Sequence, residues 1–305
     1  MRAKATRSAI VEGRKGVGPL IPPLTESQRP LRQQVFELVR AAGLIPRVQL
    51  AKDLGVSPAS VTTISSELID TGLIEEVAAP RDNEAGRGRP AVALGVRAQA
   101  HRVAGMKLSD REHTAVIVDF AGKLIADDAI PRRPGPMSLP EILEAIETLL
   151  DRVCAKAGVG RSELSAIGIG LPGFVDCSEG MVFWSSILAQ RSVPIAAAAT
   201  ARLGLPVYVD NDANLVALAE LWFGAGRSLS DFAVVTIEHG VGMGFVMNHR
   251  IYRGAQRLGM ELGHTKVQLD GALCRCGQRG CLEAYVADYA LAREATTALN
   301  WGHKE

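Results

Sequence analysis

The sequence contains no apolar run of the roughly 18 residues that a membrane-spanning helix needs. Its N-terminus is basic but lacks an apolar core and a small-residue cleavage site, so it does not resemble a secretory signal. These absences favour a cytoplasmic protein without a membrane partner. Disulfides are rare in that compartment, so cysteines that cluster in the sequence are expected to bind metal or to take part in catalysis.

Net charge is also nearly absent, because 34 Lys and Arg stand against 33 Asp and Glu. The charge is uneven, since residues 1–100 carry +4 and the remainder carries −3. This mild asymmetry permits an N-terminal part that faces nucleic acid but does not require one. Length and composition suggest a globular protein of about two domains.

Residues 1–24 show no hydrophobic periodicity and are interpreted as a flexible tail. Apolar residues then recur at helical spacing in three consecutive segments, which predict helices over residues 29–43, 47–55 and 57–70. In the third helix, Ser57 is a plausible N-cap and Pro58 suits the first helical position. Two short strands, predicted within residues 73–80 and 89–96, complete the segment.

This order of helices and strands is typical of a winged helix-turn-helix, predicted here for residues 25–97. A small helical domain for protein contact is the alternative. DNA binding is favoured because the third helix offers short hydroxyl side chains, which suit close approach to base edges, while basic residues would contact phosphates. The predicted DNA-binding residues are Arg47, Lys52, Ser57, Ser60, Thr62, Thr63, Ser66, Arg87 and Arg89.

From about residue 98 onward, short strands alternate with amphipathic helices, which indicates an α/β domain over residues 98–305. Strands are expected within residues 102–109, 113–120 and 123–130, a helix within 138–158, a buried strand within 164–176, a strand–turn–helix within 206–224, and two strands joined by a glycine turn within 231–252.

Three of the five cysteines, Cys274, Cys276 and Cys281, form a C-x-C-x4-C pattern with glycines between them. A disulfide between the first two would be strained at that spacing. Zinc needs a fourth ligand, and His264 lies ten residues upstream of the first cysteine. The pattern therefore predicts a zinc site with a Cys3His ligand set. Three unliganded loop thiols are the alternative.

Four stretches of the sequence resemble the motifs of a known family. The stretch "GHTKVQLDGALCRCGQRGCLE" resembles the zinc signature of the ROK family (repressors, open reading frames and kinases), and "GLPGFVD", "VDNDANLVALAE" and "EHGVGMGF" occur in the family's order. The resemblance covers residues 29 to about 290. It implies a ribonuclease H-like, actin-like sugar-kinase fold in which two lobes close over a sugar.

The resemblance also implies a monosaccharide site. In the family's kinases, the aspartate that matches Asp212 is the general base on the attacking hydroxyl; the alternative is that Asp212 only caps a helix. His264 could use one ring nitrogen for zinc and the other for a sugar hydroxyl. The matching sugar-binding positions are Gly173, Ser186, Asn211, Asp212, Glu261, His264 and Glu283.

The sequence departs from the family's kinases at their two phosphate-binding turns. Ser109 and Asp110 stand where the first turn has glycines, and Glu238 lies in the second turn, so side chains and negative charge would oppose a nucleotide phosphate. The family also continues well past the cysteine pattern, whereas this sequence stops at "ALNWGHKE". The second lobe is therefore expected to be incomplete, which also opposes ATP-dependent catalysis.

These patterns together favour a sugar-responsive transcriptional regulator, a repressor of carbohydrate genes, rather than an enzyme. Its expected partners are a double-stranded DNA operator and a monosaccharide effector, its cofactor is zinc, and two half-sites would require a homodimer. The alternative is an ATP-dependent sugar kinase that uses Asp212. A third interpretation is an inactive fragment that folds poorly.

Overall fold

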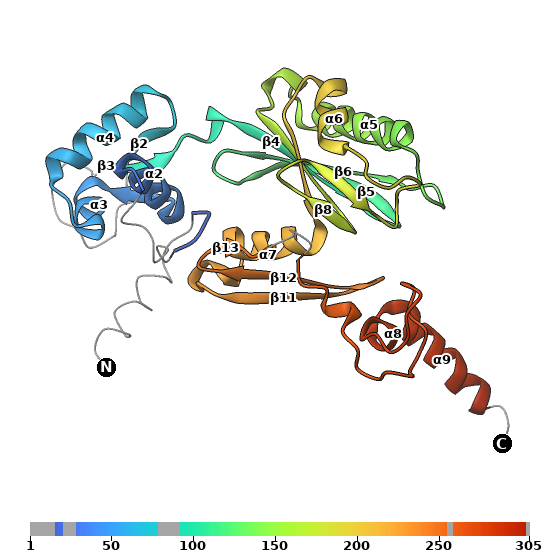
Figure 1. Cartoon of the computed structure of the whole chain (residues 1–305). Coiled ribbons are helices and arrows are strands. Elements are labelled where there is room, and N and C mark those ends of the chain that lie inside the picture. The colour runs from blue at the N-terminus through green and yellow to red at the C-terminus, as the bar shows by residue number, and fades with distance from the viewer. Residues whose placement is uncertain (1–15, 21–28, 79–91, 255–258, 303–305) are drawn as a thin grey trace, which may run out of the picture.

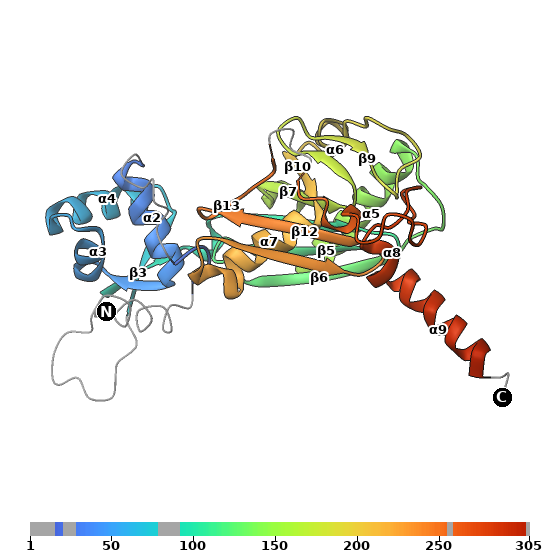
Figure 2. The same ribbon diagram turned by 60° about the horizontal axis from the view of Figure 1, so that its bottom comes forward.

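The computed structural model describes residues 16–20, 29–78, 92–254 and 259–302, and two views of it are given in Figures 1 and 2. The predicted contacts Arg87 and Arg89 lie outside the described residues. Within those residues, no helix is both long enough and apolar enough to cross a membrane. Three assemblies follow one another along the chain, which we call the N-terminal unit (residues 29–96), the first lobe (102–211) and the second lobe (212–302).

The N-terminal unit contains the three predicted helices and the two predicted strands, together with a short strand that the sequence did not reveal. The elements are α2 (Leu31–Ala42), β1 (Leu44–Pro46), α3 (Arg47–Leu54), α4 (Pro58–Asp70), β2 (Ile74–Ala78) and β3 (Val92–Val96). The strands form an antiparallel sheet in the order β1-β3-β2. The helices and the sheet share one small apolar core.

Local chemistry explains where these helices begin and end. The Ser57 hydroxyl accepts a hydrogen bond from the Ser60 backbone N–H at 3.1 Å, and Pro58 occupies the first helical position, as predicted. Helix α3 ends at Gly55, whose φ of 66° lies in the left-handed region that glycine tolerates. The turn between α3 and α4 therefore spans three residues, 55–57.

The first lobe is built on a five-stranded sheet in the order β10-β7-β4-β5-β6. Strands β4, β7 and β10 are parallel to one another, while β5 and β6 are antiparallel additions. Helices α5 and α6 lie together on one face (Figure 1). The elements are β4 (Arg102–Leu108), β5 (Glu112–Asp119), β6 (Leu124–Pro131), α5 (Leu139–Ala157), β7 (Ala166–Leu171), β8 (Phe174–Asp176), β9 (Met181–Trp184), α6 (Ile195–Leu203) and β10 (Val207–Asn211).

The second lobe begins where β10 ends, because helix α7 starts at the next residue. It contains α7 (Asp212–Phe223), β11 (Phe232–Ile237), β12 (Val241–Met247), β13 (Arg250–Ile251), α8 (Glu283–Val286) and α9 (Asp288–Gly302). Short 3-10 helices span Ala98–Ala100, Arg161–Glu163, Ala225–Ser228 and Leu262–His264. Helix α9 projects away from the lobe, at the end of the molecule opposite the N-terminal unit (Figures 1 and 2).

Helix α7 packs on the β11–β13 sheet at very short range. A Cβ atom added to Gly244 would lie 2.6 Å from the Ala217 Cβ, and one added to Gly242 would lie 2.9 Å from the Ala213 Cβ. Both distances are shorter than van der Waals contact allows, so the glycines of "GVGMGF" serve helix packing in this structure. The same glycines fix the height of α7 above β12.

The strand-to-helix junction at Asn211 and Asp212 confirms the predicted strand–turn–helix. It lies at the carboxyl end of a parallel strand, the edge at which open α/β sheets bind ligands. The first and second lobes meet at this edge.

One buried group makes the fold sensitive to pH. The His113 side chain is 1% exposed, and neither ring nitrogen has a hydrogen-bond partner among the described residues. Burial lowers the pKa of His113 below its ordinary 6.5, and the Arg132 guanidinium lowers it further. The folded state therefore binds this proton less readily than the unfolded chain does, and stability falls as pH drops below about 6.5.

We predict that His113→Leu reduces the loss of melting temperature between about pH 7.5 and about pH 5.5, because the variant no longer carries the buried base. Thermal melts at both pH values measure this change. The matched control is His101→Gln, which alters an exposed histidine and should retain the wild-type pH dependence. Identical pH dependence in His113→Leu and wild type would contradict the assignment.

Candidate functional site

The predicted metal ligands come together in the second lobe. The ligand atoms of His264, Cys274, Cys276 and Cys281 all lie within 4.8 Å of one another. The Cys274 Sγ is 3.8 Å from the His264 Nδ1, and the Cys276 Sγ is 3.8 Å from the Cys281 Sγ. A tetrahedral zinc ion with Zn–S bonds of about 2.3 Å places its sulfur ligands about 3.8 Å apart. The spacing of the donors and their chemistry therefore fit zinc.

Two residues beside the ligands support this interpretation. The Lys266 ammonium donates to the Cys281 Sγ at 3.1 Å, and the Tyr289 hydroxyl donates to the Cys274 Sγ at 3.8 Å. Three thiolates and one imidazole would leave a divalent cation with a net negative charge, which the lysine partly offsets. Sequence reasoning did not identify either residue, and their only sequence signal is proximity to the ligands.

The thiols titrate differently because their surroundings differ. Burial raises the pKa of Cys274 to about 12, so in the absence of a cation this sulfur holds its proton at neutral pH. Burial also acts to raise the pKa of Cys281. Hydrogen bonds from Lys266, His264 and the neighbouring thiols outweigh this effect and lower the pKa to about 7. A zinc ion would supply the positive charge that stabilises all three thiolates.

The metal loop is connected to the glycine turn of the second lobe through Glu283. This carboxylate is 8% exposed, accepts a hydrogen bond from the Val241 backbone N–H at 3.2 Å and lies 3.5 Å from the Cys274 Sγ. A Cβ atom on Gly240 would lie 3.0 Å from the same carboxylate, so the turn keeps a glycine there. Glu283, predicted as a sugar contact, thus holds the metal loop against the start of β12.

The predicted pair Asn211 and Asp212 lies at the junction of the two lobes. The Asn211 side-chain oxygen caps α7 by accepting from the N–H groups of Ala213 and Asn214, and its amide donates to the Gly173 carbonyl at 3.0 Å. Asn211 is therefore the N-cap, and Asp212 occupies the first helical position. The Asp212 carboxylate also accepts from the Ala213 N–H at 3.0 Å, so it contributes to the start of α7 beside the Asn211 cap.

The Asp212 carboxylate lies in a partly desolvated position. Burial raises its pKa, an effect opposed by the hydrogen bond from the Ala213 N–H and by the Lys107 ammonium, while Glu238 raises the pKa further. Lys107 and Glu238 form an ion pair at 3.6 Å that joins the first lobe to the second. Asp212 thus stands close to charges of both signs, Lys107 from the first lobe and Glu238 from the second.

Glu261 and His264 flank the same region. A Cβ atom on Gly263, between them, would lie 2.3 Å from the Val241 carbonyl, so this turn packs directly on the start of β12. The Glu261 side chain keeps contact with solvent, yet desolvation by the surrounding protein raises its pKa, with a smaller opposing effect of His264. The adjacent residue of β12, Gly242, contacts Ala213 of α7. Strand β12 therefore supports both predicted pairs of sugar contacts, Asn211 with Asp212 and Glu261 with His264.

The remaining predicted sugar contacts belong to the first lobe. Gly173 has a φ of 117° and packs against the Trp184 carbonyl, which leaves no room for a side chain. The Ser186 hydroxyl donates to the Asp110 carboxylate at 3.3 Å. Gly173 is joined to Asn211 by a hydrogen bond, whereas Ser186 is joined to the altered phosphate turn instead.

The residues at the first altered turn, Ser109 to Arg111, are bonded to the first lobe and to the start of α9. The Ser109 hydroxyl donates to the Glu112 carbonyl at 2.7 Å, and Asp110 lies 3.8 Å from the Arg132 guanidinium. Arg111 pairs with Asp288 at 3.2 Å across the lobes. The predicted side-chain obstruction is thus accompanied by basic partners, which reduce the repulsion expected from the acidic residues alone.

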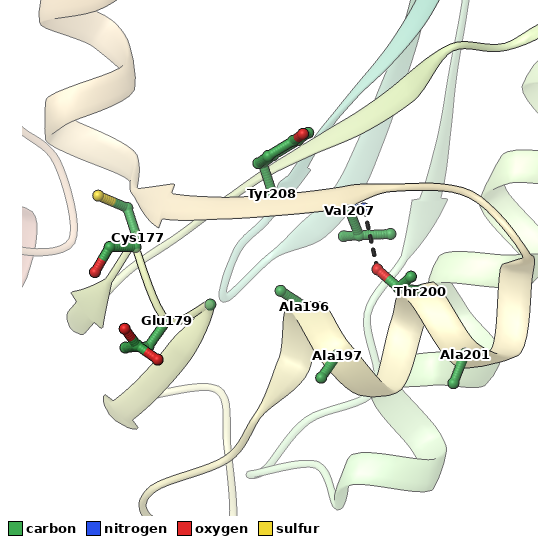
Figure 3. Close-up of a pocket in the computed structure, with 10 residues that line it drawn as sticks. Cys177, Glu179, Ala196, Ala197, Thr200, Ala201, Val207 and Tyr208 are labelled. Carbon is green, nitrogen blue, oxygen red and sulfur yellow. Dashed lines mark hydrogen bonds between the residues drawn. The ribbon is translucent and has the colours of Figure 1, made fainter.

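A separate pocket of about 480 Å³ lies between α6, the β8–β9 turn and the start of β10 (Figure 3). Cys177, Glu179, Thr200 and Tyr208 are among its lining residues, together with the alanines of α6. None of the predicted sugar-binding residues lines it. We therefore place the candidate ligand site at the Asn211–Asp212 junction and not in this pocket.

On the N-terminal unit, α4 exposes Thr62, Thr63 and Ser66, while Ser60 is partly buried. Each of the three exposed hydroxyls donates to a backbone carbonyl in the preceding turn, which leaves oxygen lone pairs and the threonine methyl groups facing outward. Two acidic residues, Glu67 and Asp70, are exposed at the C-terminal end of the helix, so the uncharged surface is confined to its first turns.

The two predicted basic contacts near α3 differ. Arg47 pairs with Glu76 of β2 at 2.7 Å and donates to the Ser65 hydroxyl at 2.9 Å, so it links α3, α4 and the sheet. Lys52 is exposed, and no ion pair of its ammonium is found in the described part of the chain. Of the two, Lys52 is the residue whose charge is available to a partner.

The arrangement of a mixed five-stranded sheet, a second lobe and a ligand edge between them defines a two-lobed α/β domain of the sugar-kinase type. A model described as the ROK family matches residues 104–304. The chain belongs to the ROK family. Its zinc-ligand pattern, its Asn-Asp pair and its glycine turn all lie within the matched region.

Relatives in this family include both regulators and kinases. The chain is 31% identical over 273 residues to the "DNA-binding transcriptional dual regulator NagC" of Escherichia coli K12, covering 88% of this chain and 65% of that protein. It is 32% identical over 196 residues to a "Glucokinase" of Streptomyces coelicolor, covering 64% of this chain and 59% of that one. The chain thus spans about two thirds or less of these relatives' length.

A solved structure matches most of the chain. The crystal structure of a ROK family transcriptional regulator, described as a homologue of the E. coli MLC protein, superposes with a TM-score of 0.70 at 28% identity. The match covers 89% of this chain and 68% of that one, so it extends beyond the two lobes.

We predict that Cys276→Ser lowers the bound zinc from about one ion per chain to a small fraction of that, because a hydroxyl is a much weaker ligand than a thiolate. Elemental analysis after dialysis measures the metal content, and a chelator should lower the melting temperature of the wild type but not of the variant. Cys177→Ser, outside the cluster, is the control. Wild-type zinc content in Cys276→Ser would exclude the proposed ligand set.

We also predict that Asn211→Ala lowers the free energy of unfolding by about 1 kcal/mol or more, because the variant loses the α7 cap and the bond to Gly173. Urea denaturation measures the loss. Asn211→Asp keeps the capping oxygen but not the amide donor, so it should fall between the wild type and Asn211→Ala. Equal stability of all three proteins would show that Asn211 does not cap α7.

Proposed function

We propose that the chain is a sugar-responsive DNA-binding transcriptional regulator, with repression as its mode of action. The observation that carries the proposal is the N-terminal unit, whose helices and sheet follow the order of a winged helix-turn-helix and whose α4 presents hydroxyls without charge in its first turns. A sugar kinase has no need of such a unit. The similarity to NagC and to the regulator of known structure supports the proposal.

In this proposal, α4 enters the major groove with its N-terminal turns. Thr62, Thr63 and Ser66 approach base edges and thymine methyl groups, and Ser57 and Ser60 lie at the leading end of the helix. Glu67 and Asp70 at the other end would repel phosphates, which favours entry by the N-terminal half. Lys52 contacts phosphate, whereas Arg47 links α3 to α4 through the Ser65 hydroxyl and to β2 through Glu76.

A monosaccharide is the proposed effector, bound where the lobes meet. Asp212 and Glu261 offer carboxylate acceptors for hydroxyl groups, and Gly173 with Asn211 shapes the opposite wall. His264 would bind zinc through Nδ1, the nitrogen nearest Cys274, which leaves its other nitrogen for a hydroxyl. Glu283 and Ser186 support the sugar-binding residues indirectly, Glu283 by holding the metal loop against β12 and Ser186 by bonding to Asp110. Two operator half-sites require two N-terminal units, so we propose a cytoplasmic homodimer.

A sugar kinase is the second candidate, because Asp212 has the position and the raised pKa that suit a general base. The ion pair between Lys107 and Glu238 and the side chains of Ser109 and Asp110 oppose it, since they fill the turns that would face nucleotide phosphates. A coupled assay with ATP and a panel of monosaccharides separates the two functions. Turnover that Asp212→Asn abolishes would establish the kinase.

We predict that Lys52→Gln weakens binding to duplex DNA and lowers the slope of log affinity against log salt by about 1, because one phosphate contact is lost. The duplex is selected from a random library by the full chain, and affinity is measured by fluorescence anisotropy at several salt concentrations. Lys156→Gln on α5, outside the N-terminal unit, is the control. Failure of the library to yield any preferred duplex would refute the proposed function.

A further inference from the structure

The N-terminal unit contacts both lobes at once. On the first lobe, the Phe36 ring stacks on Phe120 with their centroids 5.6 Å apart. On the second lobe, the Arg40 guanidinium lies over the Trp222 ring at 4.1 Å, and the Arg227 guanidinium donates to the Ala41 carbonyl at 2.8 Å. A change in the angle between the lobes therefore cannot leave both sets of contacts unchanged.

Residues 16–20, which precede the N-terminal unit, form hydrogen bonds both to that unit and to the second lobe. The Val17 N–H donates to the Arg40 carbonyl at 3.0 Å, and the Gly18 N–H donates to the Trp222 carbonyl at 2.7 Å. The Leu20 N–H then donates to the Arg227 carbonyl at 2.8 Å. The segment thus bonds to α2 on one side and to the end of α7 and the turn after it on the other.

Gly18 is the residue of this segment that bonds to both Trp222 and Arg227. Its φ is 97°, which favours glycine, and a Cβ atom there would lie 2.9 Å from the Arg40 guanidinium, so a side chain would also displace that group. The Gly18 carbonyl accepts from the Arg227 Nε at 2.9 Å. Arg227 therefore bridges the segment and Ala41 with a single planar group.

The two attachments differ in kind. The attachment to the second lobe consists of directional hydrogen bonds and one cation held over a ring, which resist sliding. The first lobe is joined to the N-terminal unit by residues 97–101, whose Ala98 carbonyl accepts from the Phe120 N–H at 3.0 Å, and by the apolar Phe36–Phe120 stack, which tolerates displacement better. The directional side-chain contacts at Arg40 and Arg227 are made with the second lobe.

Helix α7 joins this attachment to the candidate sugar site. Asn211 and Asp212 lie at its start and Trp222 near its end, about 15 Å away at 1.5 Å per residue. The glycines of β12 hold the helix against the sheet, and Glu283 joins the start of β12 to the metal loop. The second lobe thus connects the metal loop, the sugar contacts and the N-terminal unit through one packed assembly.

Three ion pairs between described residues cross from one lobe to the other. Lys107–Glu238 and Arg111–Asp288 join exposed side chains, and exposed pairs contribute little to stability. The third joins Arg253 to the buried Asp210, next to Asn211, so the lobes are held more firmly at the strand-to-helix junction than at the exposed pairs.

We propose that the junction formed by Arg40, Trp222, Arg227 and residues 16–20 fixes the N-terminal unit to the second lobe, and that this junction converts sugar-dependent lobe movement into a change in DNA affinity. The proposal rests on the proposed function. It assigns positioning roles to residues that touch neither sugar nor DNA. Sugar binding and operator binding would both survive without the junction, but the coupling between them would not.

The experiment compares Trp222→Leu and Arg227→Gln with the wild type in the full chain. Calorimetry with glucose, xylose and N-acetylglucosamine measures sugar binding, and anisotropy with the selected duplex measures DNA affinity with and without the sugar that binds. We expect a wild-type change in DNA affinity of about tenfold, falling to less than about twofold in both variants. Arg202→Gln, which removes an arginine that pairs with Glu147 outside the junction, should keep the wild-type response.

Arg40→Lys provides a second test, because it keeps a cation over Trp222 and should retain most of the response, whereas Arg40→Ala should lose it. Hydrogen exchange at the amides of Val17, Gly18 and Leu20 should rise in Arg227→Gln, which verifies that the junction has opened. A full sugar response in variants with an opened junction would overturn the proposal while leaving the regulator intact. A wild type that binds both ligands without coupling would also overturn it, and one that binds neither would refute the proposed function itself.

Discussion

Three sulfur atoms and one imidazole held within 4.8 Å of one another form a constraint on which much of the second lobe depends. The cluster has the spacing of a zinc tetrahedron, and a cation there would turn a loop with little apolar core into a fixed platform. That platform carries Glu261 and His264 on one side. Through Glu283 it also holds the start of β12, on which α7 is packed by the glycines of the turn.

In the proposed function, a kinase-like framework serves a regulatory purpose. The glycines of the second phosphate turn remain, yet here they allow β12 to approach α7 and Glu283 to approach the turn. In the first turn, Ser109 and Asp110 are bonded to their own neighbours, and Lys107 reaches Glu238 across the lobes. Charges that would meet a nucleotide are thus paired with one another, while the candidate sugar contacts remain at the lobe junction.

The N-terminal unit contacts both lobes, because it is bonded to the end of α7 and stacked on Phe120. In the proposed function, the candidate ligand site and helix α4 would therefore be coupled through the packing of one twelve-residue helix, α7, rather than through direct contact.

The sequence by itself determined the elements whose cause is local: the helices α2 to α4 with the Ser57 cap, the strand-to-helix turn at Asn211, and the C-x-C-x4-C ligand set, since periodicity, capping chemistry and ligand spacing act over a few residues. It did not reveal β1, the β8–β9 hairpin or Lys266, nor that Arg47 pairs with Glu76 and that Glu283 supports the metal loop. Apart from the local β8–β9 hairpin, the tertiary structure decided these features, and the junction at Arg227 with them, because they depend on partners that packing brings into contact.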